Sequence, residues 1–385
     1  MKPIYLDYQS TTPTDENVLK KMIPYFSEVY GNPHSANHQY GIDAYEATEN
    51  SRKKIAKAIG AQSEEIIFTS GATESNNLAI KGSFLYRMEK HNRKKIIIAA
   101  TEHKCVIEAA NSLTSLGAII SIIDVNNRGE INLEQLNNEI SDEVAIVSIM
   151  LANNEIGTIQ PIKEISNICK KFNVWLHSDA AQALGNLEVK VNDLGVDLLS
   201  ISSHKLYGPK GIGCLFVRRR PRIRLLPLID GGGQERLMRS GTLPTPLIVG
   251  FSEAMYNADQ NLKRNIKKLK SLRDRLHNHF IEFDKKIILN GTELNKNRLP
   301  NNLNYIIDGV NAVELTESLC KYVAFSTGSA CSTGNIEPSY VLTSIGLNNE
   351  EALSSFRISV GLNSTNEDID KAAKIICNKI NFLRS

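Results

Sequence analysis

Seven short runs rich in isoleucine, valine and leucine constrain the fold most, because helical patterns separate them between residues 60 and 220. Most lack polar alternation, which is typical of strands buried on both faces of a mainly parallel sheet. The runs are Glu65–Thr69, Lys95–Ala99, Ile119–Asp124, Val144–Leu151, Val174–His177, Leu198–Ser202 and Gly213–Arg218. Intervening helical segments such as Thr73–Met88 and Ile162–Lys171 suit βαβ crossovers. The pattern predicts an α/β doubly wound domain, and the absence of G-x-G-x-x-G after the first strand argues against a dehydrogenase-type dinucleotide fold.

A second, smaller α+β domain is predicted after a long amphipathic segment. That segment has one apolar face with residues three and four apart: Leu262, Ile266, Leu269, Leu272, Leu276 and Phe280. We predict that residues 15–261 form the large domain. Residues 1–14 and 262–385 would form the small one.

Composition and charge exclude several kinds of protein. The 385 residues are 42% hydrophobic and carry a formal net charge of +3, which describes a soluble globular chain and gives no case for nucleic-acid binding. The longest nearly apolar run, Val144–Ala152, is shorter than the roughly 20 residues of a membrane helix. The N-terminus lacks the apolar core of a signal peptide. A basic run, Arg218–Arg224, is either a solvated face or a protein-docking patch.

The six cysteines are scattered and include no C-x-x-C pair. This spacing argues against a zinc site and a disulfide framework, so we expect no metal and a cytoplasmic location.

Polar clusters follow five of the predicted strands. They are Gly71–Glu74, Thr101–Lys104, Asn153–Glu155, Asp179–Gln182 and Ser202–Lys205. Ligands of open parallel sheets bind at the carboxyl ends of the strands, so these clusters should meet at one rim.

One group of these residues suits a phosphate. Ala72 and Thr73 open a helix whose free N–H groups and positive dipole end attract anions. Ser202, His204 and the more distant Thr242 can add donors.

A second group suits the ring of pyridoxal 5'-phosphate (PLP). Lys205 can hold the aldehyde as a Schiff base, and Asp179 can keep the pyridine nitrogen protonated, which makes the ring an electron sink. Gln182 can hydrogen-bond the phenolic oxygen, and His103 can lie on the ring or move protons. Each residue alone has an ordinary interpretation, such as a helix cap for Asp179 or a surface lysine for Lys205. One bound PLP accounts for all of them.

Cys331 lies in the small, polar, glycine-bearing stretch Ser326–Pro338. Buried structural cysteines have apolar neighbours, whereas a thiol in a flexible, exposed loop is a candidate nucleophile. The other cysteines lie in apolar or helical contexts typical of core residues, and Cys105 differs from them in lying close to His103.

The chain resembles the cysteine desulfurases of the class V aminotransferase-like group, specifically the housekeeping iron–sulfur-cluster type. The resemblance rests on motifs that run almost end to end: Tyr5–Tyr8, Thr11–Pro13, Gly31–Ser35, Thr69–Ser75, Thr101–Lys104, Asn153–Gly157, Ile201–Gly211, Arg239–Pro244 and Ser329–Cys331. It implies the PLP-dependent transferase fold of type I, the aspartate-aminotransferase-like fold. It also implies a homodimer in which Thr242 reaches the phosphate of the neighbouring subunit.

The resemblance further implies a sulfur-transfer reaction on L-cysteine. Lys205 would act as base at the substrate Cα, and Cys331 would take the sulfur as a persulfide, which leaves L-alanine. Arg357 matches the residue that clamps the substrate carboxylate, with Asn154 assisting on the carboxylate or the ring. His103 would help with protonation.

The persulfide would pass to acceptor proteins for iron–sulfur cluster assembly, and to tRNA thiolation as a further outlet. From Ser326, the loop tip could travel on the order of 20 Å, which favours transfer to a partner. The arginine run 218–224 resembles a patch for acidic accessory partners, but the chain ends at Ser385 without the long extension that contacts the cluster scaffold. Two alternatives stay open: a selenocysteine lyase or cysteine-sulfinate desulfinase, and a catalytically silent assembly scaffold.

Overall fold

A seven-stranded sheet forms the centre of the protein in the computed structural model, which describes residues 2–327, 330–332 and 335–385, with only the backbone of 330–332, 335 and 336. The strand order is β2-β8-β7-β6-β5-β3-β4. The bounds are β2 Ile66–Thr69, β3 Lys95–Ala99, β4 Ile119–Ile123, β5 Val144–Ser148, β6 Trp175–Asp179, β7 Leu198–Ser202 and β8 Gly213–Val217. Strands β4, β3, β5, β6 and β7 run parallel, and β8 is antiparallel to β7 and β2. The seven predicted strands and the mainly parallel sheet are confirmed.

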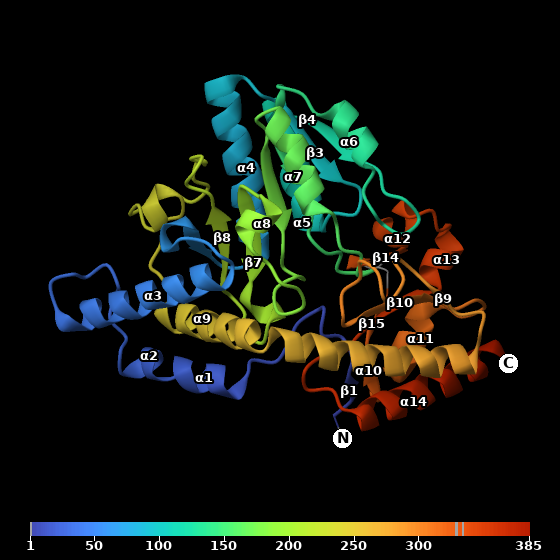
Figure 1. Ribbon diagram of the computed structural model, residues 1–385. Helices are drawn as coiled ribbons and strands as arrows, with labels where there is room; N and C mark the ends of the chain where they lie inside the picture. The colour runs from blue at the N-terminus through green and yellow to red at the C-terminus, as the bar shows by residue number, and fades with distance from the viewer. Residues whose placement is uncertain (1, 328–329, 333–334) are drawn as a thin grey trace.

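Helices cover both faces of this sheet (Figure 1). They are α1 Glu16–Met22, α2 Pro24–Ser27, α3 Gln39–Ala58, α4 Ala72–His91, α5 Lys104–Asn111, α6 Leu133–Glu139, α7 Ile162–Lys171, α8 Val191–Leu194 and α9 Thr245–Gln260. Alternate strand residues divide between the two faces: Ile96 and Ile98 pack in the cluster that contains α4 and α5, while Ile97 packs in the cluster that contains α7 and α9. Burial on both faces explains the continuous apolar runs.

The edge strand β4 departs from the expectation of burial on both faces. Ile119 is 60% exposed and Ile122 is 52% exposed. In this sheet β4 pairs only with β3, so one side and part of one face of the strand remain open to solvent.

A separate set of elements packs around a second core. The strands are β1 Ile4–Tyr5, β9 Ile288–Leu289, β10 Asn302–Ile306, β11 Val323–Ala324, β12 Ser326–Thr327, β13 Ala330–Ser332, β14 Asn335–Glu337 and β15 Ser355–Ser359. The helices are α10 Leu262–Phe283, α11 Ala312–Leu319, α12 Tyr340–Ser344, α13 Asn349–Leu353 and α14 Asn366–Arg384. Leu6 from the N-terminus is buried in this core with Leu269 and Leu276 of α10, and β1 pairs with β11. We propose on this basis that 1–14 and 262–385 form one domain and 15–261 the other.

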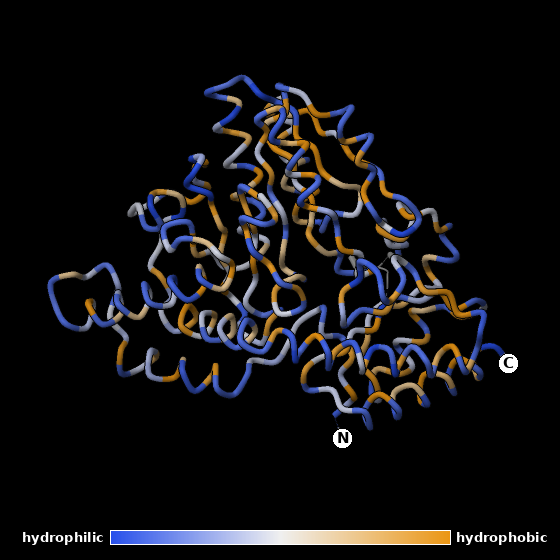
Figure 2. The backbone as a smooth tube through the Cα atoms, viewed as in Figure 1, coloured by the Kyte–Doolittle hydropathy of each residue, from blue (hydrophilic) through white to orange (hydrophobic). Residues whose placement is uncertain are grey.

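The hydropathy of the chain follows the same layers. Apolar residues concentrate in the central strands, whereas α10 alternates between apolar and polar positions (Figure 2). Within the described part of the chain, no helix combines the length and apolar character that crossing a membrane requires.

His177 gives the core a predicted pH dependence. It is fully buried on β6, where Nδ1 lies 2.7 Å from Ser148 Oγ and Nε2 lies 2.9 Å from Ser200 Oγ. Burial lowers its pKa from 6.5 to about 3, so the folded protein holds a neutral ring that the unfolded chain protonates below pH 6.5. Stability from this group is therefore present above pH 6.5 and is lost as the pH falls, by about 2 kcal/mol at pH 5.

Urea unfolding at pH 7 and pH 5 measures this effect. We expect His177→Gln to lose about 2 kcal/mol less than the unsubstituted protein between these pH values. The exposed His34, replaced in a His34→Gln control, should leave the pH dependence unchanged. An unchanged pH dependence in His177→Gln would contradict the assignment.

Candidate active site

The predicted polar clusters meet at the carboxyl ends of the parallel strands, around a pocket of about 610 Å³. Ten of the residues singled out in the sequence line it: Ala72, Thr73, His103, Asn154, Asp179, Gln182, Ser202, His204, Lys205 and Arg357. Asp179 is the last residue of β6, and Ser202 is the last residue of β7. Strand ends and the N-termini of the following helices thus build most of the pocket.

One end of the pocket is suited to an anion. Helix α4 begins after Gly71, whose φ of 150° favours glycine, and no described side chain caps its first turn. The N–H groups of Ala72 and Thr73 therefore have no side-chain acceptor in the described part of the chain. His204 lies nearby with Nδ1 3.0 Å from Thr11 Oγ1, and burial lowers its pKa to about 4.

Lys205 is one of the residues that line the pocket. Its Nζ donates to the backbone oxygens of Gln9, at 2.6 Å, and Ser10, at 2.7 Å. Burial, and secondarily the charge of Arg357, lower the pKa of Lys205 to about 8. Roughly a tenth of this amine is then neutral at pH 7, far more than for an ordinary lysine. Lys205 is therefore prepared to act as a nucleophile or base.

The Asp179 carboxylate is fixed by two hydrogen bonds. Asn76 Nδ2 donates to Oδ2 at 2.7 Å, and the N–H of Ala181 donates to Oδ1 at 2.8 Å. Asp179 itself is 5% exposed. A buried acceptor held in this way can keep a protonated ring nitrogen in place.

His103 and Cys105 form a close pair beside Asp179. The Nδ1 atom of His103 lies 3.0 Å from Cys105 Sγ and accepts from the Cys105 N–H at 3.2 Å. Partial burial lowers the pKa of His103, while Asp179 raises it. Burial and the Asp179 charge raise the pKa of Cys105 to about 11.

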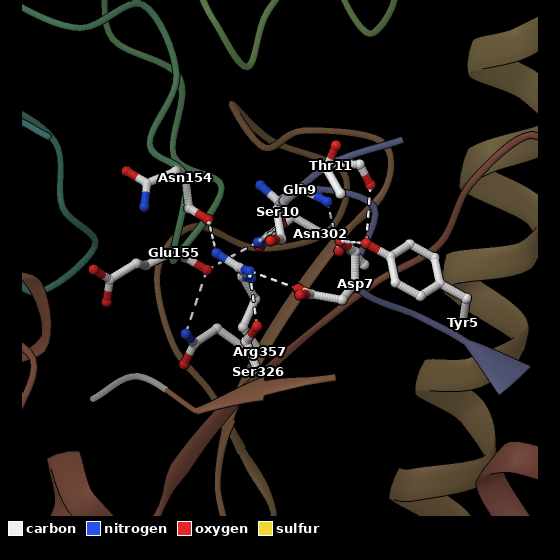
Figure 3. Close-up of polar contacts among 12 residues, drawn as sticks. Tyr5, Asp7, Gln9, Ser10, Thr11, Asn154, Glu155, Asn302, Ser326 and Arg357 are labelled. Carbon is white, nitrogen blue, oxygen red and sulfur yellow. Dashed lines mark hydrogen bonds and ion pairs between the residues drawn. The ribbon is translucent and has the colours of Figure 1, made fainter. Parts of the chain in front are cut away.

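Arg357 on β15 is held on two sides (Figure 3). Its Nη2 donates to Asp7 Oδ1 at 2.6 Å and to Ser326 Oγ at 3.1 Å, and Nη1 donates to the backbone oxygen of Asn154 at 2.9 Å. Its Nε has no partner among the described residues. Both two-point modes of carboxylate binding, through Nε and Nη2 or through Nη1 and Nη2, use Nη2. A carboxylate ligand must therefore replace Asp7 or Ser326 at that atom.

Thr242, one of the predicted cofactor-binding residues, is exposed and is not among the described residues that line the pocket. The backbone of Cys331 lies on β13, which pairs antiparallel with β14, but its side chain lies outside the described residues. The segment 326–338, predicted as a loop, contains three short strands in its described part: β12 pairs with β15, and β13 pairs antiparallel with β14.

The aminotransferase class-V family model matches residues 4–372, nearly the whole chain. The chain belongs to this family.

Relatives within this class V family share both sequence and architecture with the chain. The protein named "Cysteine desulfurase IscS" of Rickettsia prowazekii is 48% identical over 99% of this chain and 92% of its own length, and its namesake in Rickettsia bellii has the same values. A solved structure titled "NIFS-LIKE PROTEIN" superposes with a TM-score of 0.91 at 35% identity, covering 99% of this chain and all of the other. Another, titled "SspA in complex with cysteine", has a TM-score of 0.79 at 35% identity, covering 95% and 100%. The predicted fold and family are confirmed.

Several residues of this class V pocket were missed in the sequence. The backbone oxygen of Gln9 accepts from both Lys205 Nζ and, at 3.0 Å, Gln182 Nε2, while its side-chain Oε1 accepts from Asn302 at 2.7 Å. Asn76 supports Asp179. Asn76 could have been found from its position on the same helix, three residues after Thr73, because residues so spaced lie on one face.

Proposed function

We propose that this protein is a PLP-dependent cysteine desulfurase, a sulfurtransferase that converts L-cysteine to L-alanine and passes the sulfur to acceptor proteins. The observation that carries the proposal is the meeting of three features in one pocket: the low-pKa Lys205, the fixed Asp179 carboxylate and the uncapped start of α4. The names of the relatives support the same reaction.

The residues present fit PLP. Ala72 and Thr73 at the start of α4, with Ser202 and His204, would hold the phosphate, and Asp179 would bind the pyridine nitrogen. Gln182 would reach the phenolic oxygen. When bound, PLP supplies an electron sink for the carbanion at the substrate Cα.

Lys205 would move the proton at the substrate Cα. Its amine must first leave the carbonyl oxygens of Gln9 and Ser10, and its pKa of about 8 lets it both take up and return a proton near neutral pH. His103, whose lowered pKa keeps its ring neutral, would assist the proton transfers.

The sulfur step belongs to Cys331 in this proposal. Its thiolate attacks the sulfur of the substrate, the substrate Cβ–S bond breaks, and the electron pair of that bond stays on the carbon fragment, which takes up a proton and becomes alanine. The transferred sulfur remains on Cys331 as a persulfide. Acceptor proteins, including an iron–sulfur scaffold protein, would then receive this sulfur from the persulfide.

Arg357 would bind the substrate carboxylate by displacing Asp7 or Ser326 from Nη2. We expect Arg357→Lys to raise the KM for L-cysteine about 10- to 100-fold, because an ammonium group cannot form the two-point contact. Steady-state kinetics measure this. Asp7→Asn is the control: it removes the competing charge, so KM should not rise. A KM near that of the unsubstituted enzyme in Arg357→Lys would rule out the clamp.

We also propose a homodimer. Exposed large apolar side chains on the stretch from α1 to α3 include Leu19, Ile23, Phe26, Tyr30, Tyr40 and Tyr45. A second copy would cover them and bring its Thr242 to the phosphate. Sedimentation should give a dimer; a fully active monomer would contradict this.

The five cysteines with described side chains are free, which suits a cytoplasmic protein.

The direct test is product analysis with the purified PLP-loaded protein and a thiol reductant. Cysteine should yield alanine and sulfide in equal amounts. Selenocysteine and cysteine sulfinate, assayed in parallel, test the two neighbouring activities. If kcat/KM were higher for selenocysteine or cysteine sulfinate than for cysteine, that activity would be the function of the enzyme instead. No turnover of any of the three substrates would favour the catalytically silent scaffold.

A further inference from the structure

A second cavity, of about 470 Å³, lies at the amino ends of the parallel strands, whereas Lys205 lies at their carboxyl ends. It is formed where β6 begins, together with the end of α4, the end of α7 and the segment after β8. Its volume falls in the range of clefts that hold small-molecule ligands.

The cavity concentrates positive charge. Its cationic lining residues are Arg87, Arg93, Lys170, Arg218, Arg220, Arg222 and Arg224, against the one carboxylate of Asp197. Among the described residues, only Arg218 of this group has a carboxylate within 4 Å, that of Asp197 at 3.9 Å. The net charge of the chain is only +3, so this is a local excess of positive charge, which Asp197 offsets only in part.

Arg87 makes this a constructed site rather than a solvated basic surface. Its side chain lies against Trp175, with the guanidinium carbon 4.6 Å from the ring centroid, and Nη2 donates to the backbone oxygen of Asn173 at 2.7 Å. Arg87 is only 4% exposed, yet its Nε has no partner among the described residues. Burial and the nearby charge of Arg93 lower the pKa of Arg87 to about 10, and a bound anion would reverse this effect.

We propose that this cavity binds a small molecule that carries adjacent phosphate groups. Arginine binds phosphate through two parallel N–H groups, and the arginines here project from α4, the chain after it and the segment after β8, so they can surround more than one phosphate. The stacked rings of Tyr86 and Trp175, 5.9 Å apart, form an aromatic wall beside them. The proposal does not depend on the proposed desulfurase reaction, which would take place at the carboxyl ends of the strands.

Trp175 is the only tryptophan in the chain, so its fluorescence reports on this cavity. We expect pyrophosphate and ATP to change the emission of the PLP-loaded enzyme saturably at constant ionic strength. Adenosine alone should not. PLP occupies its own phosphate site in this form, which removes that route of binding. Equal affinity for pyrophosphate and ATP would identify free diphosphate as sufficient, whereas tighter ATP binding would show that the nucleoside contributes.

The double variant Arg222→Gln/Arg224→Gln tests the site itself. Both side chains are exposed, so the fold and the turnover of cysteine should be retained. The affinity for pyrophosphate should fall at least tenfold. The matched control Arg128→Gln removes an exposed arginine that lies outside the cavity, and its affinity should be unchanged. Equal loss in both proteins, the same emission change with sodium chloride, or binding of an acidic peptide but of neither phosphate compound would overturn the proposal.

Discussion

Replacing Lys205 with alanine should abolish covalent attachment of PLP and lower turnover of L-cysteine by at least about 1,000-fold. Lys205 and Lys210 are the two lysines that line the active pocket, and Lys210 is exposed. Lys205 combines burial with the lowered pKa of about 8 that supplies neutral amine near pH 7. Loss of this side chain removes both the attachment point and the proposed base at the substrate Cα.

Borohydride reduction followed by peptide mass analysis measures the attachment directly. The unsubstituted protein should carry PLP on the peptide that contains Lys205, and Lys205→Ala should carry none. Lys210→Ala is the matched control and should keep both the adduct and most of the activity. An adduct of equal yield in Lys205→Ala would show that another amine holds PLP and that the assignment is wrong.

The central sheet could be predicted from the sequence because its signals are local. Strands such as β3 and β7 were placed to the residue, since a continuous apolar run ends where the chain reaches the rim and polar side chains begin. The strand-end clusters followed from the same logic. The boundary of β5 was less accurate, because the apolar sequence continues to Leu151 after the strand ends at Ser148, and β6 extends two residues beyond its predicted end, to Asp179.

The N-terminal part of the site could not be predicted in this way. Gln9 and Ser10 contact Lys205 across 196 and 195 residues, and Asp7 contacts Arg357 across 350. These contacts exist because β1 pairs with β11 and carries the N-terminus into the second core. No local periodicity encodes such packing, so the motif at 5–8 marked the segment without showing its partners.

The properties of the described cysteines narrow the choice of the cysteine that takes the sulfur from the substrate. Burial raises the pKa of Cys169 to about 12 and of Cys377 to about 11, and that of Cys214 still further. Cys320 is exposed but is not among the residues that line the pocket. Cys105 does line the pocket, but at a pKa of about 11 roughly one molecule in 1,000 carries its thiolate at pH 8.

Cys331 is the remaining candidate, and its segment starts at the substrate site. Ser326, five residues before Cys331, shares Nη2 of Arg357 with Asp7, so the strand that leads to the thiol begins where the substrate carboxylate is proposed to bind. Cysteine bound there would have its own sulfur within the same pocket.

Cys331→Ser should therefore lower the production of alanine and sulfide more than about 1,000-fold, because a hydroxyl cannot accept the sulfur. Binding of cysteine should persist, seen as a change in the visible absorbance of the PLP-loaded protein. Cys105→Ser, the matched control inside the pocket, should keep activity within about tenfold of the unsubstituted enzyme. Unchanged turnover in Cys331→Ser would show that Cys331 is not the nucleophile. If activity were also lost in Cys105→Ser, Cys105 would be the nucleophile instead.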